Sequence, residues 1–301
     1  MSTYFSRLGG VRTGRRGDVD VNRSDLGTQV TEILADPRLD EAMIDYANRF
    51  TSLYSDSPRA VAIMGDLGRF GIVAGVFCAS PPATATTVTL TLGTGIASQG
   101  RITSHIQALV KAGVLEDAPR IGRARPVRPS PWLEGWMLRW LDAIAIPSRR
   151  WWNDGAHPDL SRDLLIRFLD QILAANREGL DAFAPTPAIH RMMSLVGGHL
   201  FLLELILATD ACHRISAPVA FSRRAFAERY GFSRSHGVDL CAEAERLGWL
   251  TRAGQGRVIV HDGFCAEALK WSAIHFALAI ASQQGRLLPV MRGVEEGGHL
   301  Q

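Results

Sequence analysis

Basic side chains gather in two short stretches of the sequence, and the chemistry they offer is the binding of phosphate. Residues 98–130 hold six basic and two acidic residues, and residues 221–257 hold seven basic and four acidic residues. The whole chain carries a net charge of only +3, so the remainder is acidic. Guanidinium groups pair well with phosphate oxygens, and clustered cations mark nucleic-acid-binding surfaces. The charge distribution therefore predicts two separate places at which the chain touches phosphates.

Enzyme motifs are absent from the sequence. It contains no GxxxxGK[ST] phosphate loop, no HExxH and no GxSxG. The pair Cys212 and His213, with His190 or His199, matches no standard spacing of metal ligands. We therefore expect no enzymatic activity, no cofactor and no bound metal.

The cysteines and the apolar runs indicate the cellular compartment of the protein. None of the four cysteines forms a CxxC pair, and each lies in an apolar or helical stretch, which is typical of buried free thiols in a reducing compartment. They are Cys78, Cys212, Cys241 and Cys265. There is no apolar signal core, and the longest apolar run, residues 200–208, contains Glu204 and is too short to span a bilayer. We expect a soluble cytoplasmic protein.

Apolar residues recur at three- and four-residue spacings in six segments, which predicts a mainly helical body. The segments are 27–54, 58–79, 131–146, 160–180, 188–210 and 263–284. The first has a break near Pro37, and the second is apolar on most sides, as expected of one buried helix. We expect a flexible basic arm over 1–25, a first half over 26–183 and a second half over 188–290.

A weak internal repeat joins the two basic stretches. Residues 96–115 align with residues 231–250 without a gap, so that Ser98 matches Ser233 and Gly113 matches Gly248. In each copy the serine is a helix N-cap and the glycine favours a left-handed end. We predict two equivalent helices, over 98–112 and 233–247.

Flanking residues extend the second copy. Ser222 begins a short preceding helix, and Tyr230-Gly231-Phe232 forms a turn into the next. We expect that next helix to direct Val238, Cys241, Leu247 and either Ala244 or Glu245 toward the core, and Arg234, Ser235 and His236 outward. Residues 250–252 and 257–260 then flank a glycine-containing turn, which predicts a β-hairpin. The first copy predicts a longer and more basic hairpin over 114–128, although the threonine-rich segment 84–94 before it favours strand.

A helix, a turn, a second helix with a glycine end and a basic hairpin together resemble the winged helix-turn-helix of MarR-like bacterial transcriptional regulators. The resemblance is carried above all by Leu-Val-Lys-Ala-Gly-Val-Leu in the first half and by Ala-Glu-Arg-Leu-Gly-Trp-Leu in the second. It implies a mainly α fold with small β-hairpin wings, here with tandem winged units on a helical body. Because MarR-like subunits carry one unit each and dimerise, this chain resembles a pseudo-dimer, present as a monomer or as a homodimer.

The resemblance implies double-stranded DNA as the partner, with helix starts in major grooves and hairpins on phosphates or minor grooves. The candidate contacts are Gln99, Arg101, Thr103, Ser104 and His105 in the first helix, Arg234, Ser235 and His236 in the second, and Arg120, Arg123, Arg125, Arg128, Gln255 and Arg257 in the hairpins. Because the two helices differ, we expect an asymmetric DNA site.

Three tryptophans at four-residue spacing, Trp132, Trp136 and Trp140, form a stripe on the helix over 131–146. Such a stripe is typical of a core face, and it is also a candidate pocket for a small aromatic effector. Two other functions remain open. A plasmid or phage replication initiator can also carry paired winged domains, and a helical interaction or ligand-binding module can retain such a fold without binding DNA.

Overall fold

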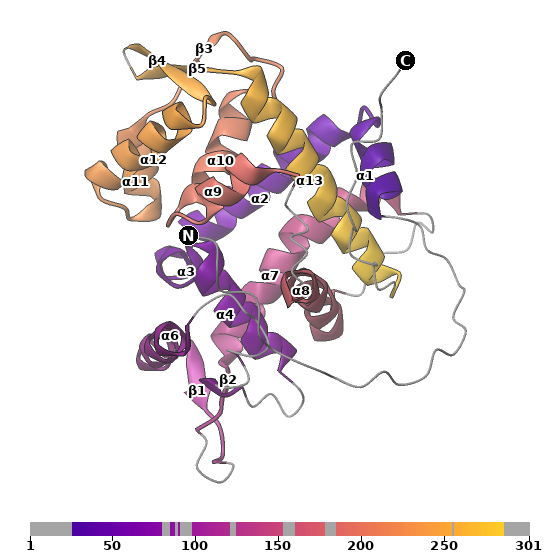
Figure 1. The fold of residues 1–301 in the computed structure, drawn as a ribbon, viewed down its shortest axis with the longest axis vertical. Helices are drawn as coiled ribbons and strands as arrows, with labels where there is room; N and C mark the ends of the chain where they lie inside the picture. Colours follow the sequence, from indigo (N-terminus) through magenta and orange to yellow (C-terminus); the bar gives the residue numbers. More distant parts are fainter. Residues whose placement is uncertain are drawn as a thin grey trace, which may run out of the picture.

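Helices make up most of the described chain, and two small antiparallel sheets lie between them (Figure 1). This computed structural model describes residues 26–79, 85–87, 90, 98–120, 125–152, 160–177, 185–254 and 256–285. The predicted arm over 1–25, Arg123, Gln255 and most of the threonine-rich segment lie outside these residues. The mainly helical class with small hairpins is confirmed.

The body is built from helices that the apolar periodicity had largely predicted. They are α1 (Leu26–Leu34), α2 (Leu39–Ser55), α3 (Pro58–Met64), α4 (Leu67–Cys78), α7 (Pro131–Ser148), the short 3₁₀ helix η1 (Arg149–Trp151), α8 (Arg162–Arg177), α9 (Pro187–Met193), α10 (Gly198–Ala208) and α13 (Asp262–Gln283). Pro58, Pro131 and Pro187 each occupy the first turn of a helix, where a missing N–H costs nothing.

Two smaller groups of elements project from the body toward the left edge of Figure 1, one low and one high. The first head consists of α6 (Gln99–Lys111), β1 (Leu115–Asp117) and β2 (Val127–Pro129). The second head consists of β3 (Pro218–Ala220), α11 (Arg223–Tyr230), α12 (Arg234–Arg246), β4 (Leu250–Gly254) and β5 (Arg257–Val260).

The prediction of a single helix over 58–79 is wrong, because the chain bends by 92° between α3 and α4. Gly65 ends α3, and the side chain of Asp66 accepts a hydrogen bond from the Arg69 N–H at 2.9 Å to begin α4. A Cβ at Gly65 would collide with the Val61 carbonyl oxygen, so the bend requires glycine. Apolar residues on both sides of this first elbow (residues 65–66) resemble one continuous helix, although Gly65 and Asp66 mark the break.

A second elbow (residues 194–197) divides the predicted helix over 188–210 into α9 and α10. Gly197 adopts a left-handed backbone, with φ of +73°, immediately before α10. The two elbows meet, because the Gly197 N–H donates to the Gly65 carbonyl oxygen at 2.7 Å. This contact joins residues that are far apart in the sequence.

The two halves of the chain pack into one another. Helix α2 of the first half packs on α10 of the second half, and α8 of the first half packs on α13 of the second. Helix α7, which follows the first head, packs on α13, which follows the second head. The core is therefore shared between the halves.

Helix α13 is long and apolar enough by length and composition to cross a membrane, and the bent pair α3 and α4 passes the same test when taken together. Most of α13 is buried against α1, α7 and α8. Burial in the core of the protein accounts for its composition.

The expectation of four free thiols is wrong for two cysteines, since Cys212 and Cys265 form a disulfide. Cys212 lies in the turn between α10 and β3, and Cys265 lies in the first turn of α13. Spacing along the chain gave no sign of the pair, because the two cysteines are 53 positions apart with the second head between them. In the turn, Asp210, Ala211 and Cys212 have positive φ angles, a backbone conformation that residues other than glycine rarely adopt.

Candidate nucleic-acid interface

Helices α6 and α12 begin in the same way. The Ser98 hydroxyl accepts from the Arg101 N–H at 3.4 Å, and the Ser233 hydroxyl accepts from the His236 N–H at 3.2 Å. Each serine is an N-cap in extended backbone, which leaves the first turn of its helix open to solvent. The predicted starts of both helices are confirmed.

The two helices also end in the same way, at aligned positions of the repeat. Gly113 and Gly248 have φ angles of +63° and +72°. The N–H of the next residue, Val114 or Trp249, bonds back to the Leu109 or Ala244 carbonyl at 2.9 Å in both cases. The Gly113 N–H also bonds to the Val110 carbonyl at 2.8 Å, and the Gly248 N–H bonds to the Glu245 carbonyl at 3.0 Å. Each helix therefore has the two bonds of the Schellman ending that a glycine favours.

Each helix then leads into an antiparallel hairpin, in the register Leu115↔Pro129 for the first head and Leu250↔Val260 for the second. A third backbone segment pairs with the far strand in both heads. It is the single bridge Ala85↔Val127 in the first head and the strand β3 in the second. The repeat in sequence is thus a repeat in local structure.

The same helix positions are buried in both copies. In α6 they are Ile102, Ile106 and Leu109, and the aligned residues in α12 are Gly237, Cys241 and Ala244. This agreement fixes which face of each helix points outward. The prediction that Val238 points toward the core is wrong, because it follows Gly237 on the outer side and is 40% exposed.

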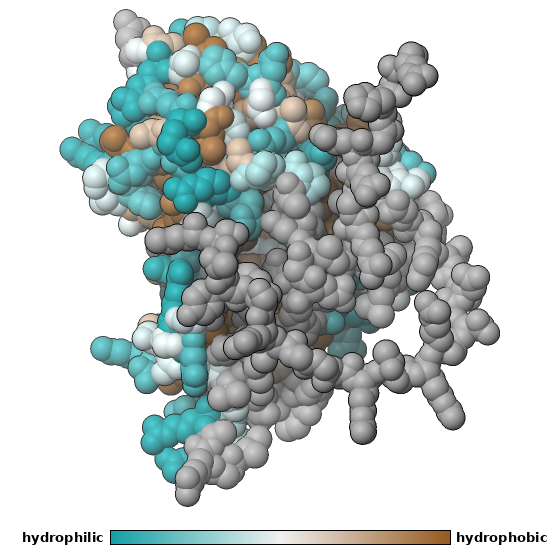
Figure 2. Space-filling view, viewed as in Figure 1, coloured by the Kyte–Doolittle hydropathy of each residue, from teal (hydrophilic) through white to brown (hydrophobic). Residues whose placement is uncertain are grey.

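The outward faces are polar and differ in sequence. Figure 2 shows hydrophilic side chains over α6 and much of α11 and α12 at the left edge of the molecule. The exposed residues of α6 include Gln99, Arg101, Ser104, Gln107 and Lys111, and those of α12 include Arg234, Ser235, Val238, Asp239 and Arg246. Sequence reasoning missed Val238, about one turn into α12, and Gln107, about two turns into α6.

The two predicted histidine contacts point toward the body instead of outward. The His236 Nε2 atom lies 2.6 Å from the Val196 carbonyl oxygen, and the ring lies 4.7 Å from that of Phe232. His105 is half-buried beside the backbone of Ile63, and burial together with Arg69 lowers its pKa. Both side chains therefore brace their helices against the elbows.

Two other predicted residues of the first head have partners within the protein. The Thr103 hydroxyl donates to the Gln99 carbonyl at 2.9 Å. The Arg101 guanidinium is 61% exposed and lies 3.9 Å from the Asp66 carboxylate at the start of α4. Arg101 thus remains accessible, with part of its charge balanced.

The arginines of the hairpins and of the start of α12 divide into paired and open groups. Arg128 pairs with Glu116 across β1 and β2 at 3.0 Å, and the Glu116 carboxylate offsets its charge. The side chains of Arg120, Arg125, Arg257 and Arg234 are exposed and form no ion pair with any other described residue. These four keep their full charge for an anionic partner.

The tryptophan stripe belongs to the core. Trp136 is fully buried with its ring 5.1 Å from Tyr54, and Trp140 contacts Phe70 at 5.0 Å and Phe168 at 5.8 Å. Trp132 is half-exposed, with the Arg59 guanidinium 4.6 Å from its ring. Neighbouring side chains therefore occupy the places that an aromatic effector would take.

The second head is fastened to the body by polar contacts. Arg191 on α9 pairs with Glu243 on α12 at 2.8 Å, and hydrogen bonds from Arg246 and Arg191 lower the pKa of Glu243 to about 2. Glu204 on α10 accepts a hydrogen bond from the Tyr230 hydroxyl at 2.7 Å and pairs with Arg229. The fastening holds α12 in a fixed orientation.

Comparison of the chain with protein-family models, with curated proteins and with solved structures gives no match.

Proposed function

We propose that the protein is a sequence-specific regulator of transcription that binds double-stranded DNA through two winged helix-turn-helix units on one chain, like a fused pair of MarR-like subunits. One observation carries the proposal. Helices α6 and α12 share caps, buried positions and endings at aligned positions of the repeat, and each presents an exposed polar face beside a hairpin with open arginines. A capped helix start beside a basic hairpin suits a major groove and its flanking phosphates.

The difference between the two outward faces supports an asymmetric DNA site. Thr103, Ser104 and Gln107 in α6 correspond by position to Val238, Asp239 and Ala242 in α12. A glutamine suits the paired donor and acceptor of adenine, whereas an apolar side chain suits the methyl group of thymine. The two half-sites are therefore unlike in sequence.

The mutual packing of the halves supports one chain per DNA site. In the order of elements, α2 to α7 parallels α8 to α13, with an elbow and a head in each. The two heads occupy the same side of one shared body (Figure 1). The complex should contain one protein chain and one duplex, as measured by mass in solution.

The decisive experiment is a mobility shift of the purified full chain with genomic fragments at low salt, including the DNA upstream of its own gene. A single bound promoter element supports the regulator. Binding only to repeated elements of a replication origin would assign the chain to the initiators. Absence of any shift at low salt would overturn DNA binding and favour an interaction module.

Single variants test which faces are used. Arg234→Ala and Gln107→Ala should each weaken specific binding by roughly 5- to 150-fold, the range for one base contact. Arg139→Ala is the matched control, because Arg139 is exposed on α7, outside both heads. Equal affinities for all three variants, with unchanged melting temperatures, would refute the assignment of the two faces.

A further inference from the structure

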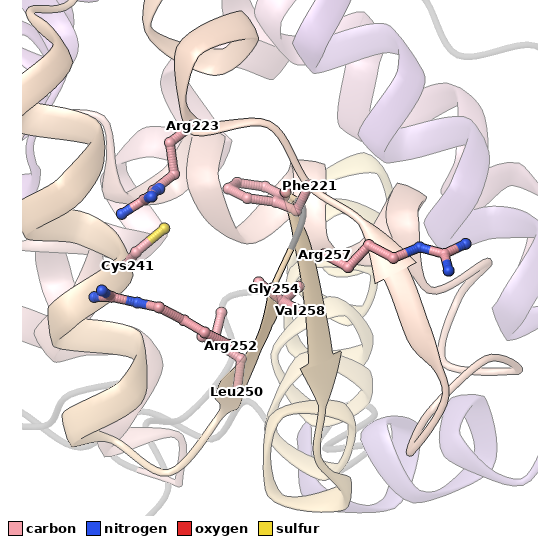
Figure 3. Close-up of a pocket in the computed structure, with 9 residues that line it drawn as sticks. Phe221, Arg223, Cys241, Leu250, Arg252, Gly254, Arg257 and Val258 are labelled. Atoms are coloured by element: carbon pink, nitrogen blue, oxygen red, sulfur yellow. The ribbon is translucent and has the colours of Figure 1, made fainter.

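A small open pocket lies in the second head, between the three-stranded sheet and the helices α11 and α12 (Figure 3). Its volume is about 130 Å³, and its lining includes Phe221, Arg223, Cys241, Arg252 and Val258. Pockets for drug-sized ligands measure roughly 300–1,000 Å³. The pocket therefore suits one small chemical group.

Two guanidinium groups define the chemistry of this pocket. In Figure 3, those of Arg223 and Arg252 point to the side on which the Cys241 sulfur lies, whereas that of Arg257 points away on the other side. Glu245 holds Arg252 at 2.6 Å, which fixes its position. Arg223 forms no ion pair with any other described residue, so its donors remain open.

The remaining groups make the pocket cationic. The charges of Arg252 and Glu245 balance, which leaves one positive charge from Arg223. Burial raises the pKa of the Cys241 thiol to about 11, so the sulfur adds no negative charge at neutral pH. A planar guanidinium with open donors binds tetrahedral or planar oxyanions by paired hydrogen bonds.

The first head carries different residues at the aligned positions. Cys241 and Arg252 correspond there to Ile106 and Asp117, an apolar and an acidic residue. The shared local structure therefore does not demand the arginine and cysteine of the second head. Their presence there is a property of that head alone.

The pocket borders the outward face of α12. Cys241 lies three residues after Val238 and seven after Arg234, so it occupies the edge of the helix that these exposed residues share. The hairpin of β4 and β5 stands on the other side of the pocket. A phosphate group bound between α12 and the β4–β5 hairpin would lie beside Arg223.

We propose that the pocket is an oxyanion site, present in the second head only, that receives a phosphate group through Arg223 and Arg252. The group comes either from the backbone of bound DNA or from phosphate free in solution. The first source rests on the proposed function, and the second does not.

The free-phosphate arm uses calorimetric titration of the full chain with inorganic phosphate, at ionic strength matched with chloride. Binding should weaken about tenfold or more in Arg223→Gln, because a charge-assisted hydrogen bond is lost. Arg224→Gln should bind phosphate as the unchanged protein does, because Arg224 pairs with Glu228 at 2.7 Å and does not line the pocket.

The DNA arm measures duplex affinity against salt concentration for the same variants. Loss of one phosphate contact in Arg223→Gln should reduce the log–log slope by about 0.9. Phosphate binding without a change of the salt slope assigns the site to free phosphate. A reduced slope without binding of inorganic phosphate assigns it to the DNA backbone. If no duplex binds, the proposed function fails while the phosphate arm still decides this inference. No phosphate binding together with an unchanged slope overturns the oxyanion site.

Discussion

The contact between the elbows and the second head makes a sharp prediction about Gly197. A Cβ at this position would lie 2.5 Å from the Phe232 Cζ atom, and the backbone is left-handed with φ of +73°. The Phe232 ring is partly buried and lies 5.7 Å from the Phe226 ring and 4.7 Å from the His236 ring. Gly197→Ala therefore forces both a strained backbone and a displaced ring.

The expected cost has two parts that can be separated. The left-handed backbone costs an alanine about 1–2 kcal/mol, and the collision with a packed ring costs about 1–3 kcal/mol. Gly231→Ala is the matched control, because Gly231 has φ of +72° and nothing within 4 Å of the added carbon. Gly197→Ala should therefore lower the free energy of unfolding by about 1–3 kcal/mol more than Gly231→Ala.

Urea unfolding followed by tryptophan fluorescence and circular dichroism measures both variants. In a Phe232→Leu background, where the ring is absent, the added cost of Gly197→Ala should fall to that of the control. Equal costs for the two alanine variants would refute the reasoning. So would a cost that Phe232→Leu leaves unchanged, since the ring would then not be the obstacle.

Three further predictions concern stability. Cys265→Ser should lower the free energy of unfolding by up to about 4 kcal/mol, since the disulfide closes a long loop. Reductant should not lower the stability of this variant further, whereas it should still destabilise the control Cys78→Ser. If reductant left the stability of the unchanged protein as it was, this prediction would be contradicted. Burial lowers the pKa of His275 to about 4 and that of His199 to about 3. The unfolded state therefore takes up these protons first, and stability should fall from pH 6.5 toward pH 4 by about 2.7 kcal/mol per pH unit at most. His275→Gln should halve the slope of that urea-unfolding profile, and an unchanged slope would rule the group out. Trp136→Ala should cost about 3–5 kcal/mol in the same assay and Trp132→Ala clearly less, and a reversed order would show that the stripe is not core.

The sequence predicted the elements that depend on local signals. Ser98 and Ser233, with Gly113 and Gly248, mark helix ends by hydrogen bonds within a few residues, and these signals do not depend on the rest of the fold. The repeat was visible because these serines and glycines, with Leu115 and Leu250, recur at aligned positions.

Features that depend on distant neighbours were missed. The first elbow is held from the other half by the Gly197 N–H, although Gly65 and the N-cap Asp66 mark the bend locally. His236 turns inward because the Val196 carbonyl lies within reach, a contact across 40 residues. The disulfide likewise joins two turns that only the packing of α10 and α13 brings together.

The candidate site was predicted in outline more than in detail. Charge counting located both heads, and it pointed to the open side chains of Arg234 and Arg257. It did not separate these from Arg128, whose partner Glu116 lies across the hairpin. Which arginines are neutralised depends on strand register, which composition does not contain.

The mutual coverage of α2 by α10 and of α4 by α8 has a consequence for biosynthesis. A nascent chain that has emerged only as far as α7 exposes the apolar sides of two helices whose covering partners are not yet translated. Such surfaces attract chaperones and other nascent chains. Completion of the tertiary structure must therefore wait until the ribosome has delivered nearly the whole polypeptide.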